Sequence, residues 1–348
     1  MTAEREQFAP GELAVVLSHY DLGVIDSAKE FTRGSRKSPK LLLRAADRRR
    51  YLLKRRAAGR DDPFKVAFAH ALLTHLHQRR FPVPALLGTR EDQNSMLQFD
   101  GRTYELFEYV EGSRYDASLE QTAHAGKTLA RFHRAVADFA TEWVPPAGGY
   151  HDSHLVRHGL NAIPSTASSH DSVIGHEAEL LALTQDLHER YDAAADHVNR
   201  AGYADWLRTI IHGDWHPGNM LFRNDRVAAV LDLDAAKYQP AVLDVANGML
   251  QFSILRGRTA PSEWPEFFDE TRMRRFLLGY LSRRPLEPAQ RTIIPQLMVE
   301  SMIAESVMPI AVTGSFGWLP GFGVLQMVQR KILWLAEAMP HVRTWLLD

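Results

Sequence analysis

The 348-residue chain contains no cysteine, and this absence removes a group of chemistries at once. Without thiols there is no disulfide, no thiolate metal site and no cysteine nucleophile. The formal net charge is −1, so the overall field favours neither nucleic acid nor an anionic membrane. No apolar run approaches the ~18 residues of a membrane-spanning helix, and residues 1–13 carry no apolar signal core. We expect a soluble cytoplasmic protein whose partners include no nucleic acid and no membrane.

What the chain does contain is a compact set of polar residues late in the sequence. Asp214, Asn219 and Asp232 follow one another at spacings of five and thirteen residues. Pro217-Gly218 indicates a turn, and the apolar runs within 220–231 indicate a hairpin that brings Asp232 back beside the loop. In phosphoryl transfer of the protein-kinase type, a loop Asp, an Asn five residues later and an Asp on a following strand form the reaction centre. The spacing therefore predicts a kinase-like active site.

Two simpler interpretations compete for the same stretch. His212 and His216 are four residues apart, which on a helix would be the spacing of a zinc pair. Gly213, Pro217 and Gly218 make a helix there unfavourable, so the zinc interpretation is the weaker one. The segment 232–234 alone could be a solvated hairpin end, but its distance from the upstream Asp and Asn favours a functional motif.

The sequences HGDWHPGN, VLDLD and LDVAN together resemble the aminoglycoside phosphotransferase and choline kinase superfamily. The resemblance implies that Asp214 is the catalytic base and that Asn219 and Asp232 are catalytic ligands of Mg²⁺. It also implies that Asp244 is a structural carboxylate that holds the loop. A cap on a helix starting near Val245 is the alternative role for Asp244.

The N-terminal third is typical of a small kinase lobe. A helix is expected over 10–19, strands near 25–31, 40–44 and 51–54, and a loop over 32–39 between the first two strands. Lys54 ends the third strand and is predicted to pair with the α- and β-phosphates of ATP. The loop has a single glycine and offers polar side chains instead, and we expect two of them, Ser35 and Arg36, to contact the nucleotide.

Residues 31–60 include twelve Lys or Arg and one acid, so a nucleic-acid patch is an alternative. The run lacks interleaved stacking aromatics, which favours solvated strands and a phosphate-facing loop.

The next helix lacks the acid that a kinase lysine needs. Asp61-Asp62-Pro63 marks the start of a helix, but no Glu lies on it. Asp61, Asp62 or His70 could hold Lys54, and the sequence does not choose among them.

A hinge is expected over 108–112. By resemblance, the carbonyl of Glu108 and the N–H of Val110 bind adenine, with Phe107 lining the pocket. A wider set of segments resembles the CotS-like and type II homoserine kinase-like branch of the superfamily: Tyr20-Asp21-Leu22-Gly23, the lysine strand, residues 64–76, Pro82-Val83-Pro84 and residues 104–112. With the catalytic stretch, this resemblance spans roughly residues 12 to 250.

After the hinge the chain is predicted to be mostly helical. Helices are expected over 119–139, where His133 reads as a satisfied core histidine, and over 177–199. Beyond residue 241 we expect helices broken by Pro285, Pro295, Pro309 and Pro320. That part has ten acidic and eleven basic residues, which does not favour a polycationic acceptor. The residues that could meet the acceptor are Glu300, Glu305 and Trp318, although core packing or an ion pair is the default role of each.

The sequence therefore predicts an α+β, protein-kinase-like, two-lobed enzyme. The N-lobe, residues 1–111, would hold an antiparallel sheet, and the C-lobe, residues 112–348, would be large and helical. We expect an ATP- and Mg²⁺-dependent phosphotransferase that acts on a hydroxyl of a small molecule such as an amino alcohol or a sugar. A protein Ser/Thr kinase of the stress-response type and a catalytically silent nucleotide-binding scaffold are the alternatives. The oligomeric state is left open.

Overall fold

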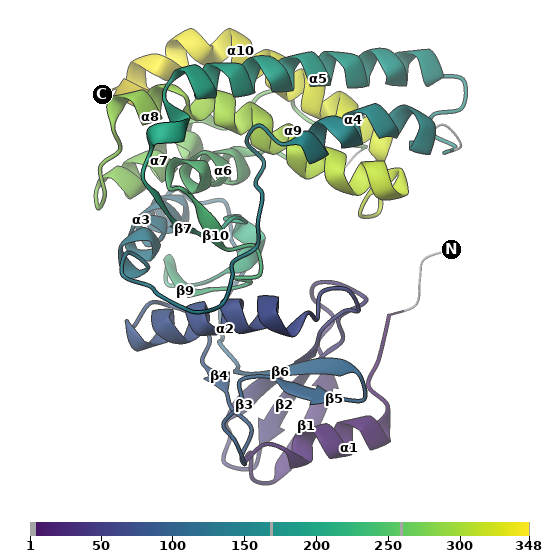
Figure 1. Cartoon of the computed structure of the whole chain (residues 1–348), viewed down its shortest axis with the longest axis vertical. Coiled ribbons are helices and arrows are strands. Elements are labelled where there is room, and N and C mark those ends of the chain that lie inside the picture. Colours follow the sequence, from purple (N-terminus) through teal and green to yellow (C-terminus); the bar gives the residue numbers. More distant parts are fainter. Residues whose placement is uncertain (1–4, 168–169, 258–259, 348) are drawn as a thin grey trace. The chain divides into compact units, whose positions relative to one another are not determined.

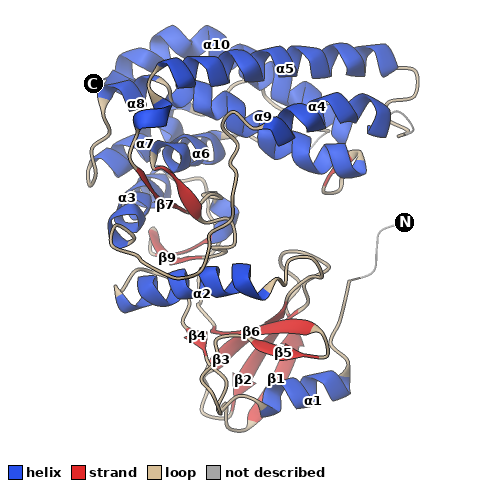
Figure 2. Ribbon diagram, viewed as in Figure 1, coloured by secondary structure: helices blue, strands red, loops and turns tan. Residues whose placement is uncertain are grey.

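The computed structural model describes residues 5–167, 170–257 and 260–347 (Figure 1). Residue contacts divide the chain into two compact units, each built from three segments. The first unit comprises Met1–Arg114, Arg134–Pro146 and Gly218–Ala236, and the second comprises Tyr115–His133, Ala147–Pro217 and Lys237–Asp348. Most strands belong to the first unit and most helices to the second (Figure 2). The predicted α+β class is confirmed, while the division at residue 111 stays a prediction.

The first unit is built on an antiparallel sheet of six strands. Its strands are β1 (Ile25–Glu30), β2 (Lys40–Ala45), β3 (Arg50–Arg55), β4 (Leu86–Leu87), β5 (Leu97–Phe99) and β6 (Arg102–Glu108). They pair in the order β1-β2-β3-β6-β4, and β5 pairs with β6. The hairpin of β8 (Met220–Arg223) and β9 (Arg226–Val230) also belongs to this unit. The strands expected from the apolar alternation are therefore present, with small shifts at their ends.

The two faces of this sheet have different characters. Helix α1 (Pro10–Ser18) packs on one face, where Leu43, Leu53 and Leu106 form part of a fully buried apolar cluster. Alternation along the strands sends the intervening residues to the opposite face. Lys54 of β3 and Glu105 of β6 are direct cross-strand partners on that second face. One face thus forms the core, and the other presents polar side chains.

Helix α2 (Pro63–Gln78) begins as predicted. Pro63 occupies its first turn, and the carboxylate of Asp62 accepts a hydrogen bond from the N–H of Phe64 at 3.0 Å. This capping contact satisfies one of the N–H groups that a helix start leaves without an internal partner. Leu72, Leu76 and their neighbours bury one side of the helix. The next helix, α3 (Leu119–Ala135), ends four residues before the predicted position 139.

The second unit is a helical assembly with short strand pairs and single helical turns attached. Its longer elements after α3 are α4 (His154–Ala167), α5 (Glu177–Arg200), α6 (Val242–Ser253), α7 (Glu270–Leu281), α9 (Ile294–Thr313) and α10 (Gly321–Leu347). The short elements are η1 (Tyr203–Asp205), β7 (Arg208–Ile211), η2 (Pro217–Asn219, at the border of the first unit), β10 (Lys237–Pro240), η3 (Pro261–Glu263), α8 (Pro288–Thr292), β11 (Ser315–Phe316) and β12 (Leu319–Pro320). Helix α9 packs against α4, α5, α6 and α10 and forms the centre of the unit.

Close helix packing explains one glycine of α3. A Cβ on Gly126 would lie 2.1 Å from the carbonyl oxygen of Phe276, which is a backbone atom of α7. Backbone cannot move away as a flexible side chain can, so only glycine fits.

One proline prediction is wrong. Pro309 lies inside α9, which continues to Thr313. A proline in a helix interior costs roughly 3 kcal/mol because it removes a hydrogen bond and crowds the preceding turn. Most residues of α9 are buried, and their packing outweighs this local cost. After α9, the strands β11 and β12 form a small hairpin.

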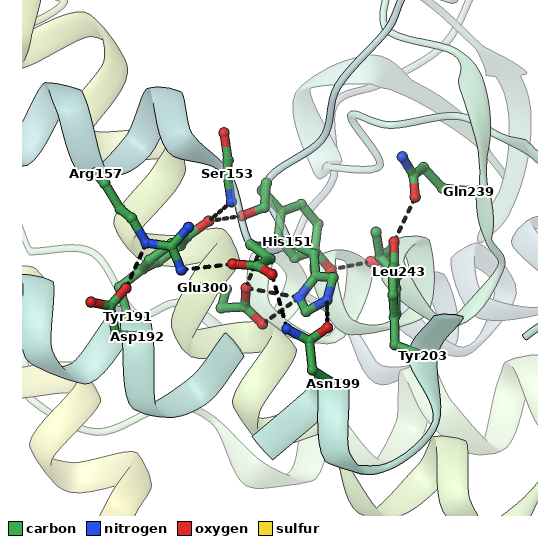
Figure 3. A network of polar contacts seen from close by, with 12 residues as sticks. His151, Ser153, Arg157, Tyr191, Asp192, Asn199, Tyr203, Gln239, Leu243 and Glu300 are labelled. Atoms are coloured by element: carbon green, nitrogen blue, oxygen red, sulfur yellow. Dashed lines mark hydrogen bonds and ion pairs between the residues drawn. The ribbon is translucent and has the colours of Figure 1, made fainter. Parts of the chain in front are cut away.

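A buried polar network fastens α4, α5 and α9 to one another (Figure 3). Its centre is Glu300 of α9, which is fully buried and accepts hydrogen bonds from Nδ1 of His151 and from the N–H of Asp152, both at 2.9 Å for Oε2. The hydroxyl of Tyr191 accepts from the N–H of Ser153 at 2.7 Å. Glu300, one of the acids that might have met an acceptor, is therefore a core residue.

Within the described ranges, no helix is both long enough and apolar enough to cross a bilayer.

Candidate active site

Asp244 fixes the backbone of the 212–214 loop. Its Oδ2 accepts a hydrogen bond from the N–H of His212 at 2.7 Å, and its Oδ1 accepts one from the N–H of Gly213 at 2.9 Å. Gly213 has a φ of +76°, a conformation in which a side chain would be strained. The predicted structural role of Asp244 is confirmed. The alternative role as a helix cap is wrong, because Ala241 occupies the N-cap of α6.

His133 supports Asp244 from α3. Its Nε2 lies 3.1 Å from Oδ2 of Asp244, and its Nδ1 lies 3.0 Å from the hydroxyl of Tyr280. Complete burial lowers the pKa of His133, although the hydrogen bond with Asp244 opposes that effect. A neutral ring with its proton on Nε2 satisfies both contacts, since it donates to the carboxylate and accepts from the hydroxyl. His133 is the satisfied core histidine that the sequence predicted.

Asp214, the predicted base, follows directly after this braced backbone. Its side chain is 45% exposed, and its carboxylate lies 3.5 Å from Nε2 of His216. Its backbone N–H donates to Nδ1 of His212 at 3.3 Å. Burial lowers the pKa of Lys237 on β10, and the charge of Asp214 works in the opposite direction. The two histidines of the zinc interpretation thus have different surroundings, since His212 is fully buried and His216 lies beside the carboxylate.

Asn219 and Asp232, the predicted magnesium ligands, lie at the same end of the β8–β9 hairpin. Met220 pairs with Val230 in this hairpin, and the N–H of Leu231 donates to the carbonyl of Asn219 at 2.9 Å. Asp232 comes one residue later with a φ of +62°, which is unusual for a residue other than glycine. Amide and carboxylate oxygens are the ligands that Mg²⁺ prefers, so this pair fits a hard cation.

The boundary between the two units falls after Pro217. Asp214 belongs to the second unit, whereas Asn219 and Asp232 belong to the first. Their common role in one reaction centre stays a prediction that the sequence spacing supports.

Lys54 finds its carboxylate on a strand and not on a helix. Its Nζ lies 3.0 Å from Oε2 of Glu105, the residue directly opposite on β6. Glu105 is 1% exposed, and this burial disfavours the ionised carboxylate and so acts to raise its pKa. Lys54, the hydrogen bond with His70 and the charge of Arg56 nevertheless hold the pKa of Glu105 well below its usual value. Glu105 is therefore a buried anion that was missed at the sequence level.

The three groups expected to hold Lys54 have other roles. Asp62 caps α2, and a carboxylate oxygen of Asp61 accepts from the N–H of Gly59 at 3.0 Å. His70, on α2, places Nε2 2.7 Å from Oε1 of Glu105 and Nδ1 2.9 Å from the hydroxyl of Ser95. The helix thus reaches the lysine only through Glu105. A signal for this arrangement exists in the alternation of the 103–108 strand, which puts Glu105 and Phe107 on one face.

Lys40 is a second cation beside Lys54. The two lysines are cross-strand partners on β2 and β3. Burial lowers the pKa of Lys40, the charge of Lys54 lowers it further, and the charge of Asp232 raises it. Its Nζ lies 3.4 Å from the carbonyl oxygens of Arg33 and Ser38, at the two ends of the predicted phosphate loop. Lys40 is a candidate phosphate ligand that the sequence did not single out.

The phosphate loop itself is held from the N-terminal side. The guanidinium of Arg5 donates to the carbonyl of Thr32 at 2.7 Å, and the N–H of Glu6 donates to the carbonyl of Arg36 at 3.0 Å. Ser35 and Arg36 are exposed, as donors to a nucleotide would be. Ser38, near the end of the loop, is buried, and its hydroxyl donates a hydrogen bond to the carbonyl of Arg55 at 2.7 Å.

The predicted hinge leaves the sheet after β6. The N–H of Glu108 donates to the carbonyl of Ala85 at 2.8 Å, and that of Tyr109 donates to the carbonyl of Arg50 at 2.9 Å. Beyond these bonds the chain is extended and irregular through Val110. Phe107, half-buried, lies beside Leu52 on the same face as Lys54. Adenine contact by Phe107, Glu108 and Val110 stays a prediction.

A small cavity of about 100 Å³ lies within the second unit. Apolar residues such as Met302 and Leu319 form much of its wall, and Glu305 of α9 also lines it. The carboxylate of Glu305 accepts hydrogen bonds from the side-chain amides of Asn247 and Gln251. Burial raises the pKa of Glu305 to about 7, with a further contribution from the charge of Asp214. Trp318, the third acceptor candidate, is 88% exposed.

Comparison with known proteins identifies the family of this chain. A sequence model described as phosphotransferase enzyme family (APH) matches residues 28–286. The chain is similar to homoserine kinase of Rhodopseudomonas palustris, with 25% identity over 291 residues that cover 83% of this chain and 80% of that protein.

Solved structures resemble this one over nearly the whole chain. The microcompartment-associated aminopropanol kinase has a TM-score of 0.69 at 15% identity, with 96% of this chain and 98% of that chain covered. Amicoumacin kinase, solved with AMP-PNP and Ca²⁺, has a TM-score of 0.66 at 11% identity, with 97% and 94% covered. At such identities the likeness shows the fold, which is protein-kinase-like. Because the family match extends over most of the sequence, the chain belongs to the phosphotransferase enzyme family and is a kinase that acts on a hydroxyl group.

Proposed function

We propose that this kinase transfers the γ-phosphoryl group of ATP, with Mg²⁺, to the hydroxyl of a small molecule that carries an amino group. The observation that carries the proposal is the loop that Asp244 holds through two backbone N–H groups. A loop fixed in this way presents Asp214 in one orientation, which general-base catalysis requires.

The first unit would bind the nucleotide. Lys54, oriented by Glu105, would contact the phosphates, and Lys40 would add a second positive charge. Ser35 and Arg36 would cover the phosphates from the loop. The backbone of Glu108 and Val110 would hydrogen-bond adenine, with Phe107 against the ring. This division of labour follows the kinase pattern of a strand lysine and a covering loop.

Asn219 and Asp232 would hold the metal. A bound Mg²⁺ neutralises and orients the phosphate oxygens. The chain's contribution is to keep two oxygen ligands at one end of a hairpin, where the N–H of Leu231 ties the backbone of Asn219 in place.

Asp214 would orient the acceptor hydroxyl and take its proton. The hydroxyl oxygen forms a bond to the γ-phosphorus, and the bond from that phosphorus to the β,γ-bridging oxygen breaks. The bridging electron pair stays with ADP, and the proton stays on the carboxyl of Asp214 until solvent removes it. His216, 3.5 Å from this carboxylate, is positioned to help orient it.

An amino group on the acceptor would account for Glu305. Glu305 is a carboxylate on the wall of a cavity that Arg256 also lines, and an ammonium group of the acceptor would give it a further charged partner. The relatives whose names state a substrate include a homoserine kinase and an aminopropanol kinase, and each of those substrates carries one amino group and one alcohol hydroxyl. The balanced charge of the C-terminal part favours such a small monoamine over a polycation.

The test is a phosphotransfer assay on a panel of acceptors. Purified protein with Mg²⁺ and ATP is offered amino alcohols, neutral sugars and casein, and ADP release above the acceptor-free rate is measured. We expect turnover on an amino alcohol. Asp214→Ala should lower kcat by about 10²–10⁴-fold while leaving ATP binding and folding in place, since it removes only the base. Near-wild-type kcat in that variant would refute the assignment, and turnover on casein alone would favour a protein kinase.

A further inference from the structure

Arg56, the first residue after β3, joins two parts of the candidate site within the first unit. Its Nη2 donates to Oε1 of Glu105 at 2.8 Å and to Oδ1 of Asp234 at 2.8 Å. Its Nη1 donates to Oδ2 of Asp234 at 2.9 Å and to the carbonyl of Arg60 at 3.0 Å. Arg56 itself is only 7% exposed. A planar guanidinium that holds both oxygens of one carboxylate fixes direction as well as distance.

The charges of this cluster balance. Lys54 and Arg56 supply two positive charges, and Glu105 and Asp234 supply two negative ones. Glu105 divides its oxygens, with Oε2 toward Lys54 and Oε1 toward Arg56 and His70. Both carboxylate oxygens of Asp234 accept hydrogen bonds from Arg56. Arg56 and Glu105 are buried, so removal of one leaves the other uncompensated, whereas the side chain of Asp234 is 38% exposed and keeps contact with water.

Asp234 is only two residues from Asp232, and the backbone between them is constrained. Asp232 has a φ of +62°, an unfavourable region for a residue with a side chain. Such a conformation persists only where its surroundings hold it on both sides. On one side the N–H of Leu231 bonds the carbonyl of Asn219. On the other side Leu233 is 5% exposed, and Asp234 is held by Arg56.

We propose that Arg56 is a positioning residue that links the Lys54–Glu105 pair to the backbone around Asp232, whose carboxylate is the predicted metal ligand. Asp234 is the counter-ion of Arg56 and not a magnesium ligand. Loss of the Arg56–Asp234 contact would free Asp232 to relax toward an ordinary conformation. The carboxylate of Asp232 would then leave the metal position. The proposal rests on the proposed function, because it takes Asp232 as a metal ligand.

The experiment measures metal binding directly. Mn²⁺ is titrated into the full-length protein in the presence of AMP-PNP, and free Mn²⁺ is followed by electron paramagnetic resonance. The variants are Arg56→Gln, Asp234→Asn and the double variant, and Arg56→Lys keeps the charge without the two-pronged geometry. Partners that orient a metal ligand typically contribute 10–100-fold to metal affinity, and we expect each single variant to lose about that much.

The double variant should bind no more weakly than the weaker single variant, because either change already breaks the contact. Arg56→Lys should also lose affinity, since an ammonium cannot hold both oxygens of Asp234.

Arg55→Gln is the matched control. Arg55 is also buried and also pairs with two carboxylates, Glu6 and Glu12, but on the face of the sheet that α1 covers. It should lose thermal stability and keep wild-type Mn²⁺ affinity. Thermal unfolding of every variant identifies those that do not fold, and Arg56→Lys then replaces Arg56→Gln.

Three results would overturn the proposal. One is unchanged Mn²⁺ affinity in folded Arg56→Gln and Arg56→Lys. Another is weakened binding in Asp234→Asn with wild-type binding in both Arg56 variants, which would make Asp234 a ligand. The third is additive losses in the double variant. If wild-type protein bound neither AMP-PNP nor Mn²⁺, the proposed function would fail as well, and that result separates the two failures.

Discussion

Substitution of Glu105 by Gln isolates the contribution of a single buried negative charge. Gln keeps the size of the side chain and an oxygen acceptor, but it leaves Lys54 and Arg56 with one fewer counter-charge. Removing one partner from a buried charge pair typically costs about 3–5 kcal/mol. We expect a loss of about 3 kcal/mol, at the lower end, because His70 and Arg56 keep an oxygen to bond and because the Lys54 side chain is 21% exposed. Urea denaturation measures this loss.

The same change should misplace Lys54. Displacement of a positioning group by about 1 Å can cost about 100-fold in rate, so kcat/KM for ATP should fall by about that factor. Glu12→Gln is the control, because Glu12 pairs with buried Arg55 at 2.7 Å on the other face of the sheet. The control should lose stability and keep its kcat/KM for ATP. Equal kcat/KM values for wild type and Glu105→Gln would refute the role of Glu105.

The pH dependence of the unfolding free energy independently tests whether the charge of Glu105 stabilises the protein. The partners of Glu105 hold its pKa well below the ordinary value of 4.5 in the folded protein, despite its burial. A carboxyl with a depressed folded pKa stabilises the protein above its unfolded pKa, and that stabilisation is lost as the pH falls through the folded value. The difference in unfolding free energy between wild type and Glu105→Gln should therefore be full at pH 6–7 and shrink below about pH 4.

Three further predictions concern the second unit. Because the pKa of Glu305 is raised to about 7 by burial and by Asp214, kcat/KM for an amino-alcohol acceptor should rise with pH up to about 7 and then level, and Glu305→Gln should flatten this rise. Burial lowers the pKa of Lys331 from 10.5 to about 8, so wild-type stability in urea should increase between those pH values, a slope that Lys331→Met removes. Glu300→Ala leaves His151 and the N–H of Asp152 without their acceptor and should cost about 3–5 kcal/mol of unfolding free energy.

Much of the candidate site could be predicted from short sequence patterns. The loop predicted to be catalytic, the hairpin after it and Asp244 lie within 40 residues of one another, so turn residues and strand alternation were enough to order them. The start of α2 was equally legible, because Pro63 and the capping Asp62 are adjacent in the sequence. In each case the interacting residues are close together in the sequence, and their residue types indicate the interaction.

What could not be predicted depends on the register of distant segments. The Lys54–Glu105 pair needs β3 and β6 to align although the two residues are 51 positions apart in the sequence, and a shift of one residue would turn Glu105 to the opposite face. The contact of Arg56 with Asp234 spans 178 positions. The prediction at Pro309 was wrong for a different reason. Proline usually ends a helix, but the packing of α9 outweighs this local preference.

Glu105, the acid that pairs with Lys54, lies on a strand and not on a helix, and this position has a consequence for regulation of the enzyme. In protein kinases the lysine pairs with a Glu on a helix, and repositioning of that helix makes or breaks the pair. Here Lys54 and Glu105 face each other on neighbouring hydrogen-bonded strands, so a shift of α2 leaves both in place. Such a shift would remove only the His70 contact with Glu105. His70→Ala should therefore lower stability more than it lowers kcat/KM for ATP, whereas Glu105→Gln should lower both. If His70→Ala abolished activity in a protein that remained folded, the helix would govern the lysine after all.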